Sequence, residues 1–136
     1  MPDYLQNPSI ADLELTVSDG TTEIDLVADW TDDAPRTRRA LDDALPVAGD
    51  AARWGDELYF SIPVDIDPEN ARAEVEVGSL AYWPAGAKLC LFWGPTPAST
   101  GEKPRAASPV NVVACVRDVS ALSAVEGGAH VRVERA

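Results

Sequence analysis

The sequence is poor in residue types that define several common classes of protein. Its 136 residues include one His, two Cys and two Lys, and no Cys-x-x-Cys motif is present. A zinc site therefore has no ligand set, and we expect no metal and no cofactor. The two Cys would suffice for one disulfide, but a reducing compartment disfavours it. Cys90 and Cys115 lie in apolar runs and are predicted to be buried free thiols.

Long hydrophobic runs are also missing. No apolar stretch reaches the ~18–20 residues that a transmembrane helix needs. The first residues, Met-Pro-Asp-Tyr-Leu-Gln-Asn-Pro, contain neither the basic nor the apolar region of a secretory signal. The sequence thus predicts a cytoplasmic protein that does not bind membranes.

Positive charge is scarce. The chain has 23 acidic residues, 14 of them Asp, against 11 basic ones, and its net charge is −12. Binding of nucleic acid needs clustered cations, and the only cluster is Arg36, Arg38 and Arg39, so no nucleic-acid partner is expected. Adaptation to a halophilic cytoplasm is the favoured explanation, because Lys is almost absent while short carboxylates abound. Biased coding toward Arg and Asp in a mesophile is the alternative.

What the sequence does contain indicates one folded domain. Residues 1–10 are predicted to form a flexible arm, and residues 11–136 are long and apolar enough for a core of their own. Alternating apolar residues at 13–17 and 24–28, with a Ser-Asp-Gly turn between them, predict a β-hairpin. A helix is predicted over 34–45, with an Asp of Thr31-Asp32-Asp33 as its cap, Pro35 in its first turn and Pro46 after its end.

The rest of the chain reads as short strands separated by Gly and Pro. Strands are predicted at 57–61, 73–77, 80–83, 88–93, 110–116 and 130–134, with an exposed loop at 98–107 and a short second helical turn near 120–125. Eight or more strands, one main helix and no alternation of strands with helices predict a mostly β fold, a closed barrel.

Four blocks of sequence carry a resemblance to a known family. They read Trp-Gly-Asp-Glu-Leu-Tyr-Phe at 54–60, Tyr-Trp-Pro-Ala-Gly at 82–86, Leu-Cys-Leu-Phe-Trp-Gly-Pro-Thr-Pro at 89–97 and Ala-Ser-Pro-Val-Asn-Val at 107–112. Over about residues 11–135 the chain resembles the small prokaryotic cyclophilin-like domain proteins of unknown function. The resemblance implies an eight-stranded cyclophilin-like barrel, in agreement with the strand pattern.

The same resemblance does not bring the chemistry of true cyclophilins, which are peptidyl-prolyl isomerases. Their activity depends on an arginine near a Phe-His pair, whereas the corresponding strand here reads Tyr59-Phe60-Ser61. Fold alone does not carry function across a family.

Large aromatic and polar residues beside the Gly and Pro turns are candidates for a ligand-binding groove at the barrel mouth. They are Trp54, Glu57, Tyr59, Phe60, Trp83, Trp93, Thr96, Ser108 and Asn111. In the alternative interpretation, the rings fill the barrel core and the polar groups serve turns and strands. If the groove exists, loop 98–107 is expected to form its rim.

No residue is assigned a catalytic role. Ser99 and Ser108 have no base nearby in sequence, and Asp56 and Glu57 are adjacent, so their side chains would point to opposite faces of a strand. The favoured function is a non-catalytic module that binds a peptide or small molecule. The alternatives are a prolyl isomerase using Arg53 or Arg117, and a subunit of an amide-hydrolysing metabolic enzyme, as the family resemblance allows.

Overall fold

The computed structural model describes residues 10–136, and all but one residue of the predicted arm at 1–10 lies outside this range. The elements are β1 (Leu13–Ser18), β2 (Glu23–Trp30), α1 (Pro35–Ala44), β3 (Val47–Arg53), β4 (Glu57–Ser61), β5 (Arg72–Glu74), β6 (Ser79–Trp83), β7 (Lys88–Phe92), β8 (Arg105–Val116), the 3₁₀ helix η2 (Ser120–Ala124) and β9 (Ala129–Arg135). The predicted hairpin, main helix, strand 57–61 and second helical turn are all confirmed.

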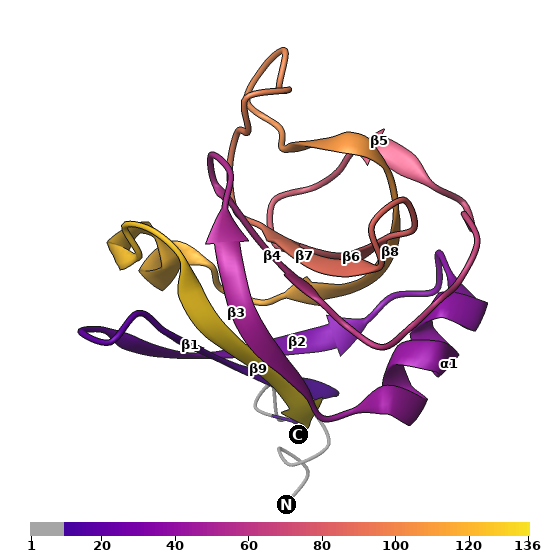
Figure 1. Ribbon diagram of the computed structural model, residues 1–136, viewed down its shortest axis with the longest axis horizontal. Helices are drawn as coiled ribbons and strands as arrows, with labels where there is room; N and C mark the ends of the chain where they lie inside the picture. The colour runs from indigo at the N-terminus through magenta and orange to yellow at the C-terminus, as the bar shows by residue number, and fades with distance from the viewer. Residues whose placement is uncertain (1–9) are drawn as a thin grey trace, which may run out of the picture.

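Eight of the strands close into a ring, as predicted. Their order is β2-β1-β9-β3-β4-β7-β6-β8, and β8 pairs back to β2 through Ala114–Val116 and Ala28–Trp30. All pairings are antiparallel, and the short β5 adds to the other end of β8, outside the ring. In Figure 1, β5 and the first part of β8 arch over β4, β7 and β6 at the top of the view. The fold is therefore a mostly β, closed eight-stranded barrel with one main helix.

The barrel core follows from the period-2 alternation of each strand. Leu13, Leu15 and Val17 of β1 are buried, with exposed or half-buried residues between them. The hairpin turn is stabilised because the Asp19 carboxylate accepts hydrogen bonds from the backbone N–H groups of Thr21 and Thr22 at 2.9 and 2.7 Å. These bonds hold the pKa of Asp19 below its usual value.

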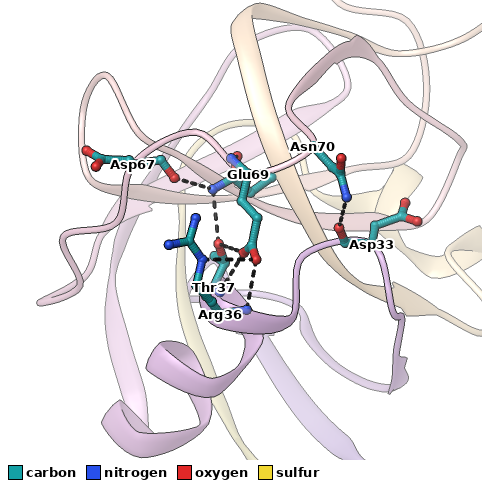
Figure 2. Close-up of polar contacts among 7 residues, drawn as sticks. Asp33, Arg36, Thr37, Asp67, Glu69 and Asn70 are labelled. Atoms are coloured by element: carbon teal, nitrogen blue, oxygen red, sulfur yellow. Dashed lines mark hydrogen bonds and ion pairs between the residues drawn. The ribbon is translucent and has the colours of Figure 1, made fainter.

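The helix is capped differently from the prediction. Its N-cap is Ala34, and no side chain of residues 31–34 caps it, so the predicted Asp cap is wrong. Instead Glu69, from the segment between β4 and β5, accepts hydrogen bonds from the backbone N–H groups of Arg36 and Thr37 at 3.0 and 2.9 Å (Figure 2). A carboxylate here satisfies free helix donors and complements the helix dipole.

Asn111 completes this polar network from β8. Its side chain is fully buried, and its amide nitrogen donates to Thr37 Oγ1 and to the Asp67 carbonyl, while its oxygen accepts from the Glu69 N–H. The network ties α1 and the segment before β5 to strand β8 of the barrel.

Several boundaries differ from the sequence pattern. Strand β3 was not predicted, because Val-Ala-Gly-Asp-Ala-Ala-Arg has few residues of high β propensity. Gly49 has a packing reason, since a Cβ there would lie 3.1 Å from the Phe60 ring of the neighbouring strand β4. Strand β8 begins at Arg105, so the predicted exposed loop at 98–107 is too long by three residues. The prediction of two buried thiols is wrong for Cys115, which is exposed, and right for Cys90.

A cleft on the outer face of the barrel

A cleft of ≈ 300 Å³ lies on the outer face of β4, β7 and β6. Strand β4 supplies Glu57 and Tyr59, and the turn before it supplies Trp54. The first residues of β8 cross the opposite side of the cleft and form its other wall. The remaining walls are Trp83, Cys90, Ala106, Ala107 and Val110.

Strand alternation separates the cleft from the barrel core. On β4, Leu58 and Phe60 belong to the main core, whereas Glu57 and Tyr59 face outward. On β7, Cys90 belongs to a second, smaller apolar cluster, which Trp83 of β6 and Val110 of β8 also join. Because β8 covers this outer face, a sheet surface that would otherwise meet solvent becomes a partly enclosed, mostly apolar site.

Glu57 is the polar centre of the cleft. Only 5% of the residue is exposed, and its Oε1 atom has no hydrogen-bond partner. Burial raises the pKa of this carboxyl from its ordinary 4.5 to about 7, and the neighbouring Cys90 thiol acts weakly in the opposite direction. Near neutral pH the group therefore exists in both protonation states.

The Cys90 thiol faces the same cavity from β7. Its burial, together with the charge of Glu57, raises its pKa well above the ordinary value. The sulfur therefore stays protonated at neutral pH, and Cys90 acts as a small apolar wall with a weak donor.

The Trp83 ring is fixed on two sides. Its indole N–H donates to Ser108 Oγ on β8, which joins the two walls of the cleft. Gly86 lies against the ring, and a Cβ on Gly86 would come within 2.6 Å of it. Glycine is thus required at this turn for the ring to occupy its place.

The turn that carries Trp54 is locked to the segment after β7. Gly55 has a φ of +61°, and a Cβ there would lie 2.7 Å from the Thr96 Cα atom. The backbone N–H of Asp56 donates to the Pro95 carbonyl at 3.0 Å, and that of Trp54 donates to the Glu57 carbonyl at 2.9 Å. A left-handed glycine and close backbone contact therefore set where Trp54 begins the cleft wall.

Four predicted site residues line the cleft and one supports it, whereas the other four lie elsewhere. Trp54, Glu57, Tyr59 and Trp83 line it, and Ser108 holds Trp83. Phe60 does not line the cleft, because residues adjacent in a strand face opposite sides and Phe60 packs in the barrel core. Asn111 follows Val110, which lines the cleft, so the Asn111 side chain points to the other face of β8. There it belongs to the polar network that anchors α1.

Trp93 and Thr96 also lie outside the lining of the cleft. Trp93 packs partly buried against the main core, with the Arg53 guanidinium 5.3 Å from its ring centroid. Thr96 is buried in its turn, where its hydroxyl donates to the Arg105 carbonyl. Both had been placed at the mouth because they adjoin Gly94-Pro95, and the turn folds toward Asp56 instead.

One wall of the cleft could not be predicted from the sequence; it consists of Cys90, Ala106, Ala107 and Val110. Small and apolar residues carry no functional signal by themselves. Only the pairing of β4 with β7, which sets Tyr59 opposite Cys90, reveals that Cys90 faces the site.

Neither arginine proposed for isomerase chemistry lines the cleft. The Arg53 guanidinium donates to the Gly55 and Val125 carbonyls and pairs with Asp56 at 3.0 Å. Arg117 pairs with Asp29 at 2.8 Å, close to where β2 meets β8. Residues 10–136 contain no cluster of three His, Cys, Asp or Glu side chains suited to a metal ion. In the same range, no helix has the length and apolar character needed to cross a membrane.

Comparison with known proteins identifies the family of this barrel. The family model described as cyclophilin-like matches residues 12–134. The chain therefore belongs to the cyclophilin-like family, as the four sequence blocks had indicated. No curated protein matches the chain significantly.

Two solved structures share the fold. The solution structure of the hypothetical protein AF2241 from Archaeoglobus fulgidus has 39% sequence identity and a TM-score of 0.68, covering 96% of this chain and 99% of that one. The structure of McbB in complex with tryptophan has 16% identity and a TM-score of 0.67, covering 90% of this chain and 44% of that one. At that identity the likeness to McbB concerns the fold alone.

Proposed function

We propose that this protein is a binding module that takes a small molecule, or a peptide side chain, in the cleft over β4, β7 and β6. The observation that carries the proposal is a buried carboxyl oxygen without a partner in an otherwise apolar, aromatic-walled cavity. Ligand sites typically combine a mostly apolar lining with a few polar groups that fix orientation.

The walls also support a role in binding rather than in packing alone. A cavity of ≈ 300 Å³ is at the lower end of the size of ligand pockets and suits a compact molecule of about one aromatic ring. The indole of Trp83 is held in place by Ser108 and Gly86, so it needs little ordering when a ligand binds.

A direct test is to fill the cleft with a side chain. Ala107 is exposed and lines the cleft, so Ala107→Phe should obstruct it without disturbing the core. Ala48 is an exposed residue of β3 outside the cleft lining, and Ala48→Phe is the matched control. Benzyl alcohol, followed by two-dimensional NMR, should bind the wild type and the control with a dissociation constant on the order of 1 mM, or about −4 kcal/mol.

Binding to Ala107→Phe should be weaker by about tenfold or more, which corresponds to roughly 1.4 kcal/mol. Equal binding to wild type and Ala107→Phe would place the ligand elsewhere and contradict the proposal.

The same preparation should leave the cis/trans exchange of a short X-Pro peptide at its uncatalysed rate. An acceleration abolished by Arg53→Ala or Arg117→Ala would instead favour an isomerase.

A further inference from the structure

The unpartnered oxygen of Glu57 indicates what kind of ligand fits the cleft. Among the described residues, the only other buried side-chain nitrogen or oxygen without a partner is Thr31 Oγ1, and Thr31 does not line the cleft. A buried acceptor left without a donor is unfavourable, and native structures rarely retain one without a reason. A donor brought by a ligand would satisfy it.

The cleft itself offers the Glu57 carboxyl only a weak donor, the Cys90 thiol, and Oε1 remains without a partner. The Trp83 indole N–H is already bonded to Ser108, and the β8 wall consists of Ala106, Ala107 and Val110. Arg53 is the arginine nearest to Glu57 in the sequence. Its guanidinium already bonds to the Gly55 and Val125 carbonyls and to the Asp56 carboxylate. The remaining functional group of the site is therefore an acceptor among aromatic rings.

Three aromatic walls accompany this acceptor. Trp54, Tyr59 and Trp83 line the same cavity, and aromatic faces attract cations as well as flat apolar groups. The net charge of −12 also favours the approach of a cation over that of an anion.

We propose that the cleft binds a primary organic ammonium ion with a flat apolar body. The ammonium group donates to Glu57 Oε1, and the body lies among Trp54, Tyr59 and Trp83. This assignment rests on the proposed function, of which it specifies the ligand class. A charge-assisted hydrogen bond in a site of low polarity would be the main source of selectivity over neutral analogues.

The titratable groups around Glu57 set how binding depends on pH. From β7, the Cys90 thiol faces it and stays protonated, and from β4 itself comes the Tyr59 phenol. Lys88 Nζ lies 6.0 Å from the Tyr59 ring centroid and donates to Ser61 Oγ. Trp83 of β6 and the β8 wall do not titrate. Glu57 is thus the group whose ionisation controls ammonium binding near neutrality.

The test compares benzylamine with benzyl alcohol, which have the same ring and differ in charge. Titrations followed by NMR are run at pH 6 and pH 8 in 1 M KCl, where the Debye length of about 3 Å suppresses attraction by surface carboxylates. An aliphatic amine stays protonated over this range. Only the ionised form of Glu57 would bind it well, so benzylamine affinity should rise about tenfold from pH 6 to pH 8. Benzyl alcohol affinity should stay constant.

Two variants separate the role of Glu57 from that of general charge. Glu57→Gln should lower benzylamine affinity at pH 8 to that of benzyl alcohol and remove its pH dependence. Glu23→Gln removes one exposed carboxylate at the start of β2. It should change neither the benzylamine affinity nor its pH dependence. A further readout on the wild type is the carboxyl ¹³C signal of Glu57, whose pKa should fall by about one unit on saturation with benzylamine.

The outcomes distinguish this inference from the function on which it rests. If both probes bind the cleft equally at pH 8 and the Glu57 carboxyl does not shift, the ammonium assignment is wrong and the binding module stands. If neither probe contacts the cleft, the proposed function fails with it.

Discussion

The burial of Glu57 makes folding depend on pH in a direction opposite to that of paired carboxylates. Its native pKa of about 7 lies above the ordinary 4.5, so between these values the folded protein retains a proton that the unfolded chain releases. The contribution of this group to stability is therefore complete below pH 4.5 and declines until the pH passes 7. The total change is about 3 kcal/mol, from 1.36 kcal/mol per pKa unit.

We expect Glu57→Gln to cancel this decline, because the amide stays neutral. The free energy of unfolding of the variant relative to wild type, measured with urea, should rise by up to about 3 kcal/mol between pH 5 and pH 8. Glu23→Gln provides the control for loss of one carboxylate at an exposed site. Wild-type and Glu57→Gln curves that stay parallel over this range would show that burial does not raise the pKa.

Trp93 should affect stability and leave the cleft unaffected. Its ring packs against the main core beneath the Arg53 guanidinium, 5.3 Å from the ring centroid. Trp93→Ala should therefore cost about 2–3 kcal/mol in urea unfolding, less than a fully buried Trp. Binding of benzyl alcohol to the folded fraction should not change. If Trp93→Ala kept its stability but no longer bound benzyl alcohol, Trp93 would belong to the ligand site.

At the scale of elements, α1 depends on a carboxylate from a distant segment. Glu69 accepts four hydrogen bonds from Arg36 and Thr37, at 2.8–3.4 Å (Figure 2). Burial opposes ionisation of Glu69, but these bonds outweigh it and lower the pKa below its ordinary 4.5. The stabilisation is thus present above pH 4.5 and is lost as the pH falls through the native value.

Removing this cap should weaken the helix. We expect Glu69→Ala to reduce the free energy of unfolding at pH 7 by about 1–2 kcal/mol, as for loss of other N-caps. The difference should shrink in acid, where the wild-type carboxylate is protonated. Glu102→Ala, in the exposed loop before β8, serves as the control. Amide exchange in the first turn of α1 that is no faster in Glu69→Ala would contradict the capping role.

Elements with strong local patterns could be predicted from sequence, and those that depend on distant partners could not. The β1–β2 hairpin follows from alternation and an Asp-Gly turn, and the helix from its Pro boundaries. Strand β3 was missed because it has few residues of high β propensity, and the reason for Gly49 is the Phe60 ring of the neighbouring strand β4. The helix cap was missed because Glu69 is more than thirty residues away.

The candidate site could likewise be predicted only in part from the sequence. Its aromatic residues could be found by their place beside Gly and Pro turns, and four of the nine predicted residues line the cleft. Phe60 and Asn111 lie outside the cleft because the face of a strand residue depends on register, which a list of residue types does not contain. The small wall residues from β7 and β8 gave no signal at all.

For the whole molecule, the net charge of −12 should make stability depend on salt. At 0.01 M ionic strength the Debye length of ~30 Å allows carboxylates across the barrel to repel one another. The melting temperature should therefore rise steadily from dilute buffer to molar KCl. A flat response would remove the case for halophilic adaptation and favour biased coding as the origin of the acidity.

The most direct test of the cleft uses the four tryptophans as internal reporters. Their indole N–H signals can be assigned with single Trp→Phe variants and followed during titration with benzyl alcohol and benzylamine at pH 8. Trp54 and Trp83 line the cleft, whereas Trp30 and Trp93 pack against the main core. The account predicts saturable shifts of Trp54 and Trp83 with Trp30 and Trp93 unmoved. Shifts of Trp30 or Trp93 as large as those of the other two, or no shift of any indole signal, would contradict it.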